Sequence, residues 1–109
     1  MTTVIIRKTA DGSYQGFTCR GHSGFARKGR DIVCASVSVL VINTINSIEK
    51  LADGKMDIET DEKAGYIQCQ FSLPLSKAGK LFMDSMILGL SEIAEQYGKK
   101  YLTLNYEEV

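Results

Sequence analysis

Apolar and polar residues alternate in two short stretches at the start of the chain. The first, "TVIIRK" at positions 3–8, is an apolar run that ends at the turn sequence "ADGS". The second, "YQGFTCR" at 14–20, places Phe17 and Cys19 on one face of an extended segment. Two such runs joined by Asp-Gly are typical of a hairpin. We therefore predict a β-hairpin whose Phe17 and Cys19 face the core.

The segment from 31 to 52 contains neither Gly nor Pro and predicts a helix. Its apolar residues recur at intervals of three and four, although "VSVLVI" (37–42) taken alone is equally compatible with a strand. Length decides for a helix, which would span about 33 Å. Apolar residues continue around most of its circumference, so we expect a partner subunit to cover part of it. The residues that recur at helical spacing are Val33, Val37, Leu40, Val41, Thr44, Ile48 and Leu51.

A second hairpin is predicted where "KMDIET" (55–60) and "GYIQCQFSL" (65–73) flank the turn "DEKAG". Alternation in the second strand places four residues on the inward face, namely Ile67, Cys69, Phe71 and Leu73.

The rest of the chain predicts a helix and a strand. After Pro74, Ser76 is a good N-cap for a helix that ends at Gly98. Leu81 and Leu88, seven residues apart, lie off its apolar stripe, and "YLTLNY" (101–106) alternates as a last strand. The stripe consists of Phe82, Met83, Met86, Ile87, Leu90, Ile93, Ala94 and Tyr97.

The order of elements, ββαββαβ, predicts an α+β fold with two helices packed on a mostly antiparallel sheet of about five strands. The chain has 109 residues, of which 44% are hydrophobic, and shows no repeat or linker. These values suit one compact domain over residues 1–109.

Charge and composition exclude several classes of partner. The net charge is zero and the pI is about 6.6, so the chain has no electrostatic bias toward nucleic acid or an acidic membrane. The start has too short an apolar run for a signal peptide, and no stretch approaches the roughly 18 apolar residues of a membrane span. Three cysteines without metal-ligand spacing predict free thiols. We expect a cytoplasmic protein.

The candidate chemistry lies in "GHSGFARKGRDIVC" (21–34), which holds the single histidine, His22, and ends at Cys34. If Asp31 is the N-cap, Cys34 is the third helical residue, where unpaired N–H groups and the helix dipole favour a thiolate. The dipole contributes about 0.3–1 kcal/mol, whereas a tenfold shift in ionisation takes about 1.4 kcal/mol. His22 is the one residue in the sequence that can supply the rest as an imidazolium. A thiol, an imidazole and free N–H donors are the parts of an acyl-transfer site.

Each of these residues also has a purely structural interpretation. His22 alone fits a solvated loop, and Cys34 alone fits a small buried hydrophobe, as we expect for Cys19 and Cys69. Asp31 fits a helix cap better than a catalytic acid. Ser38, one turn beyond Cys34, suits either substrate contact or close packing. The basic residues of the loop, Arg27, Lys28 and Arg30, fit a solvated surface better than a phosphate site.

The stretch "GHSGFARKGRDIVCASVS" strongly resembles the signature of the bacterial ribosomal-processing cysteine protease family, Prp. Gly21, His22, Asp31, Cys34 and Ser38 all match the signature, and the resemblance extends over the whole chain. It implies a small α+β homodimer with a His and Cys catalytic pair. It further implies a bacterial enzyme that removes a short N-terminal extension from the precursor of large-subunit ribosomal protein twenty-seven, cutting after a Phe.

Carried over by residue, the resemblance implies that His22 maintains Cys34 as the nucleophile, with the N–H groups of Cys34 and Ala35 near the helix start receiving the oxyanion. Gly21, Gly24 and Gly29 would let the loop move over a bound peptide. No cofactor, metal or nucleic acid is expected. Two alternatives remain: a non-enzymatic ribosome-assembly factor that binds a ribosomal protein or RNA through residues 27–30, and a thiol redox sensor, which would have no resolving cysteine.

Overall fold

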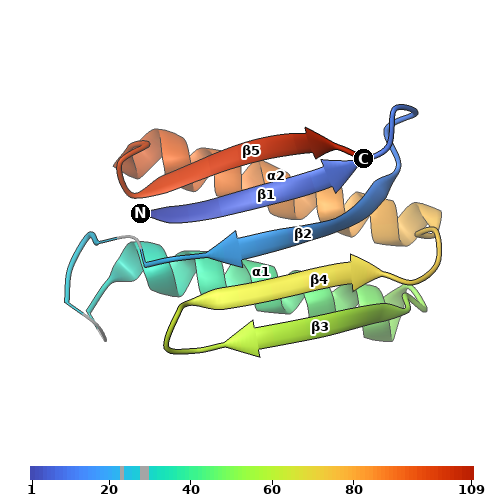
Figure 1. Cartoon of the computed structure of the whole chain (residues 1–109), viewed down its shortest axis with the longest axis horizontal. Coiled ribbons are helices and arrows are strands. Elements are labelled where there is room, and N and C mark those ends of the chain that lie inside the picture. Colours follow the sequence, from blue (N-terminus) through green and yellow to red (C-terminus); the bar gives the residue numbers. More distant parts are fainter. Residues whose placement is uncertain (23, 28–29) are drawn as a thin grey trace.

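The computed structural model describes residues 1–22, 24–27 and 30–109, and its two hairpins occur where alternation predicted them (Figure 1). The first hairpin pairs β1 (Thr2–Lys8) with β2 (Tyr14–Arg20), and the second pairs β3 (Met56–Asp61) with β4 (Tyr66–Phe71). Each hairpin is followed by a helix, so sheet and helix segments alternate along the chain in the predicted order.

Both helices begin after their predicted N-caps, and the second ends at its predicted stop. Helix α1 (Ile32–Leu51) begins after Asp31, and α2 (Lys77–Tyr97) begins after Ser76, whose Oγ accepts a hydrogen bond from the Gly79 N–H at 3.1 Å. Gly98 ends α2 with a positive φ of 104°, a conformation that glycine adopts without strain. Strand β5 follows at Leu102–Glu108.

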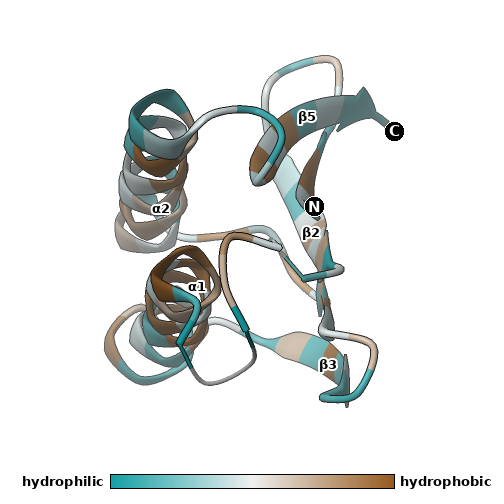
Figure 2. Ribbon diagram, turned by 90° about the vertical axis from the view of Figure 1, so that its left-hand side faces the viewer, coloured by the Kyte–Doolittle hydropathy of each residue, from teal (hydrophilic) through white to brown (hydrophobic). Residues whose placement is uncertain are grey.

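The five strands form one sheet in the order β3-β4-β2-β1-β5. Neighbouring strands pair antiparallel, except that β1 and β5 pair in parallel, with Thr2 opposite Leu102. Figure 2 shows α1 and α2 side by side on the same face of this sheet. The predicted α+β class, with two helices on a mostly antiparallel sheet in the order ββαββαβ, is confirmed.

The core lies between the sheet and the helices, and most predicted inward positions are buried. Phe17, Cys19 and Cys69 are buried in the sheet, and Leu81 and Leu88 are exposed as their off-stripe positions predict. One inward position is wrong: Leu73 is 59% exposed, because β4 ends at Phe71. Leu51, the last residue of α1, is 72% exposed and lies beyond the last buried residue of the helix, Ile48.

The prediction about membrane spans needs a correction at α1. By length and composition this helix is apolar enough to cross a bilayer, because its 20 residues include only two charged side chains, Glu49 and Lys50. Val33, Val37, Val41 and Ile48 nevertheless belong to the buried core beneath the sheet. We therefore assign α1 as a core helix, with an outer face that exposes residues such as Val39.

Candidate functional site

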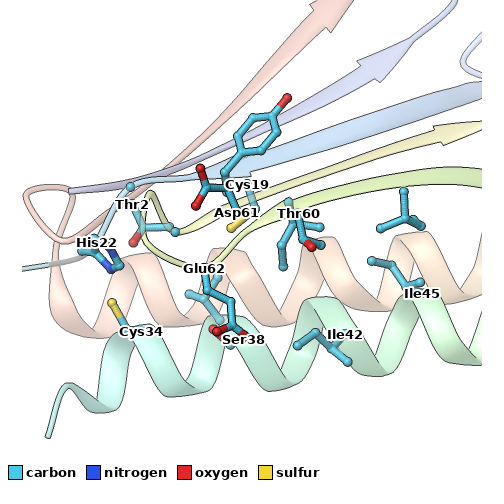
Figure 3. A pocket seen from close by; sticks show the side chains of 16 residues that line it. Thr2, Cys19, His22, Cys34, Ser38, Ile42, Ile45, Thr60, Asp61 and Glu62 are labelled. Atoms are coloured by element: carbon cyan, nitrogen blue, oxygen red, sulfur yellow. The ribbon is translucent and has the colours of Figure 1, made fainter. Parts of the chain in front are cut away.

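The site lies where the end of β2 meets the start of α1. Gly21 and His22 follow β2 directly, and Cys34 is half-buried in the first turn of the helix. Figure 3 shows the Cys34 sulfur pointing toward the His22 ring at one end of a cavity. The fold thus brings the histidine and the cysteine of the sequence motif to one wall.

Asp31 fixes the start of α1, as predicted for an N-cap. Its Oδ1 accepts a hydrogen bond from the Cys34 N–H at 2.9 Å. Its Oδ2 accepts from the N–H groups of Phe25 at 3.1 Å and Ala26 at 3.4 Å. One buried carboxylate therefore caps the helix and also ties down part of the loop that precedes it.

The two N–H groups expected to receive an oxyanion are already engaged. The Cys34 N–H donates to the Asp31 carboxylate, and the Ala35 N–H donates to the Asp31 carbonyl oxygen at 3.0 Å. A side-chain cap occupies the third helical N–H, and the first intrahelical bond occupies the fourth. The expectation that the N–H groups of Cys34 and Ala35 are free is therefore wrong for this conformation.

His22 is exposed and contacts the turn between β3 and β4, a contact that the sequence analysis missed. Its Nε2 lies 3.1 Å from the carbonyl oxygen of Lys63. Gly21 has a φ of 89°, and a Cβ there would lie 2.5 Å from the Met1 carbonyl oxygen, so only glycine fits. The sequence indicated a turn at "DEKAG", but no local signal indicated that its Lys63 would contact His22, 41 residues earlier in the chain.

Two adjoining cavities share the wall formed by His22, Cys34 and Ser38. The first, of about 470 Å³, lies between α1 and the β3–β4 hairpin, and its apolar surface includes Ile42 and Ile58. Further apolar lining comes from Val37, Ile45 and Ile67, and polar lining from Thr60, Asp61 and Glu62. A volume of this size is common for ligand sites.

The second cavity, of about 460 Å³, lies against the loop and the start of α1 and is lined by residues such as Gly24, Ala26, Arg30 and Ile32. Because Cys34 lines both cavities, an extended chain that passes from one to the other would cross the thiol. Ser38 is exposed and also lines both, which places it within the site as predicted.

The loop that precedes α1 packs against the opposite end of the chain. The Phe25 ring contacts Tyr97 and Tyr101 edge to face, with centroids 5.4 Å and 5.1 Å away. Arg27 and Arg30 are exposed, in agreement with a solvated surface. The expectations for Lys28 and Gly29 lie outside the described residues.

The three thiols differ in their surroundings. Burial raises the pKa of Cys19 to about 11, with a smaller upward contribution from Cys34 nearby. Burial also raises the pKa of Cys69 to about 12, against a smaller lowering by Arg7. Cys34 is half-buried and lines both cavities. Among the residues with described positions, no group of three or more His, Cys, Asp or Glu is placed to hold a metal ion.

Comparison with known proteins gives consistent matches. The sequence profile of the family described as Cysteine protease Prp matches residues 1–102. The chain is 30% identical over 101 residues to the ribosomal processing cysteine protease Prp of Bacillus subtilis (strain 168). That alignment covers 89% of this chain and 90% of the relative. It is 28% identical over 107 residues to the protein of that name from Staphylococcus aureus (strain Mu50), covering 98% of this chain and all of the relative.

Solved structures agree with the sequence matches. A crystal structure of the essential ribosomal processing protease Prp from S. aureus, in complex with a covalently linked product peptide, superposes with a TM-score of 0.92 at 28% identity. That alignment covers 98% of this chain and 100% of the other. A crystal structure of a Streptococcus mutans protein superposes with a TM-score of 0.83 at 27% identity, covering 100% of this chain and 96% of the other.

The environments of the thiols predict the order in which they react. With iodoacetamide near neutral pH, Cys34 of the folded protein should be alkylated first, because burial shields Cys19 and Cys69 and raises their pKa values to about 11 and about 12. Peptide mapping by mass spectrometry gives the rate at each site. Unfolding in guanidinium chloride serves as the control, since it should make the three rates similar. Equal rates in the folded protein would contradict the assignment.

Proposed function

The chain belongs to the Prp family of ribosomal-processing cysteine proteases, and on that premise we propose that Cys34 and His22 are its catalytic pair. The observation that carries this proposal is that these two side chains, from the end of β2 and the start of α1, share the wall between two adjoining cavities. A peptide lying across both cavities would present a carbonyl to the thiol.

The proposed reaction begins when His22 takes the proton of the Cys34 thiol and the resulting thiolate attacks the scissile carbonyl carbon. The tetrahedral intermediate collapses, the C–N bond breaks, and the leaving amine takes the proton from His22. Water, which gives a proton to the same imidazole, then attacks the thioester. The acid product leaves, and the proton returns to the Cys34 sulfur.

Asp31 and Ser38 have supporting roles in this proposal. The Asp31 carboxylate sets the position of Cys34 by capping the helix through the Cys34 N–H. Ser38 carries a hydroxyl on the shared wall one turn beyond the thiol, and we assign it to substrate contact. The dipole of α1, a helix of 20 residues, favours negative charge at its N-terminus and hence the thiolate.

We propose that the substrate is the precursor of large-subunit ribosomal protein twenty-seven, cut after a Phe in the cytoplasm. The apolar cavity beside α1 supports the proposal that a large apolar side chain precedes the cut. Ile42 and Ile58 expose 48% and 40% of their surface there, and an aromatic ring would cover them. The crystal structures of the S. aureus protease with a substrate peptide and with a covalently linked product peptide are consistent with peptide cleavage.

We also propose that the protein is a homodimer. Val39 of α1 and Leu81 and Leu88 of α2 expose 69%, 67% and 62% of their surface, and a second copy would remove such residues from water.

Loss of either catalytic residue should abolish cleavage. Cys34→Ala and His22→Ala should each leave a full-length precursor intact by mass spectrometry, while changing the free energy of unfolding by no more than about 1 kcal/mol. Cys69→Ala is the matched control, because it removes a cysteine that lies outside both cavities and should retain cleavage. Cleavage by either Cys34→Ala or His22→Ala would exclude the proposed pair.

The residue before the cut should matter through the apolar cavity. Replacing that Phe by Ala in the precursor should lower kcat/KM about 10- to 200-fold, because burying such a side chain contributes roughly 1.5–3 kcal/mol. Ile58→Ala should lower it as well, and the two changes together should cost less than their sum, because each removes the same contact. Ile32→Ala, in the second cavity, is the control and should combine additively. Additivity with Ile58→Ala would place the Phe elsewhere.

Light scattering at micromolar concentration tests the homodimer. The expected mass is twice the 12.0 kDa of one chain. Leu88→Glu should shift the mass toward the monomer, because a charge on the covered face loses its hydration. Leu73→Glu, equally exposed but outside the helices, should leave the dimer intact. A monomer mass for the unmodified chain would refute the proposal.

A further inference from the structure

The turn between β3 and β4 reaches the imidazole of His22. The Lys63 carbonyl oxygen lies 3.1 Å from His22 Nε2. The turn itself is held by Asp61, whose Oδ1 accepts from the N–H groups of Lys63 at 3.1 Å and Ala64 at 3.3 Å. The Gly65 N–H donates to the Glu62 carbonyl at 3.2 Å. The carbonyl that faces His22 is thus part of a hydrogen-bonded turn.

We propose that this turn positions the catalytic imidazole, with the Lys63 carbonyl binding Nε2–H and Gly65 acting as the positioning residue that permits the contact. The inference rests on the proposed function, since it assigns a role in the reaction of His22 with Cys34. It adds a third component to that pair, supplied by main-chain atoms of a different hairpin.

The chemistry of the contact fixes the proton arrangement of the ring. A carbonyl oxygen only accepts hydrogen bonds, so Nε2 must carry a hydrogen. Nδ1 is then the nitrogen that takes the proton from the Cys34 sulfur and later gives it to the leaving amine. Nε2–H is bonded to Lys63 in both the neutral and the protonated ring. Because a carbonyl does not titrate, this contact stays in place through the whole cycle.

Gly65 permits the close approach of the turn. Its φ is +60°, and a Cβ at this position would lie 2.6 Å from the Gly21 carbonyl oxygen and 3.0 Å from His22 Cε1. Any other residue would therefore push the turn away from Gly21 and displace the imidazole. Gly12, in the turn between β1 and β2, has a φ of +87° but no atom within 4 Å of its Cβ position. The two glycines share the backbone constraint, and only Gly65 has the contact with His22.

This difference provides a matched pair of variants. Gly65→Ala and Gly12→Ala both place a side chain in the left-handed region, and both should lower the melting temperature, Gly65→Ala by more because its Cβ also meets the Gly21 carbonyl oxygen. On precursor peptide, Gly65→Ala should lower kcat about 100-fold with little change in KM, as expected when a base moves by about 1 Å. Gly12→Ala should retain the wild-type kcat. Gly65→Asn, which tolerates the positive φ but keeps the Cβ, should be as impaired as Gly65→Ala.

NMR reads the contact without substrate. Since His22 is the only histidine, its ring signals need no assignment by mutation. At low temperature the hydrogen-bonded Nε2–H proton should give a downfield resonance in the wild type and in Gly12→Ala, and this resonance should be lost in Gly65→Ala. If Gly65→Ala does not fold, Asp61→Ala, which releases the turn without adding atoms, should lose the resonance; the resonance is the readout for this variant because Asp61 also lines the first cavity.

Three results would overturn the proposal: a neutral ring with its hydrogen on Nδ1, wild-type kcat in Gly65→Ala, or recovery of kcat in Gly65→Asn. A wild-type protein that shows the hydrogen-bonded Nε2–H but does not cleave the precursor would instead contradict the proposed function and support the contact with Lys63.

Discussion

The site depends on the hydrogen bonds that the Asp31 carboxylate accepts. It accepts hydrogen bonds from the N–H of Cys34 on one side and from those of Phe25 and Ala26 on the other. Without it, the N–H groups of Phe25 and Ala26 in the loop and of Cys34 in α1 would lose these hydrogen bonds, and the helix and the loop would no longer share an anchor. The position of the thiol relative to the loop is therefore set by one buried side chain.

Sheet order supplies what local sequence does not. Because β4 lies next to β2, the turn that precedes β4 comes beside the residues that follow β2. Gly21 and Gly65 allow the two backbones to approach, and the Lys63 carbonyl meets His22 as a result. The same arrangement places the β3–β4 hairpin opposite α1 and so forms the apolar cavity beside Cys34.

Local signals predicted the elements and the motif well, since alternation, capping residues and glycine stops act within a few residues of each other. Asp31, Ser76 and Gly98 bound the helices as expected. The Asp31 cap was predicted, but its consequence was overlooked: an N-cap Asp accepts a hydrogen bond from the third helical N–H, which here is that of Cys34. The sequence could not reveal the Lys63 contact or the exposure of Leu73, because both depend on where a strand ends and which strands become neighbours.

The parallel pairing of β1 with β5 constrains how the chain reaches this structure. β1 is an inner strand, and one of its edges is paired only by the last strand in the sequence, with Thr2 opposite Leu102. Contacts so distant along the chain form late and slow the folding reaction. During synthesis, the edge of β1 that pairs with β5 keeps its backbone N–H and C=O groups unpaired until the C-terminal residues leave the ribosome. Such an open edge exposes a nascent protein to strand-to-strand association with other chains.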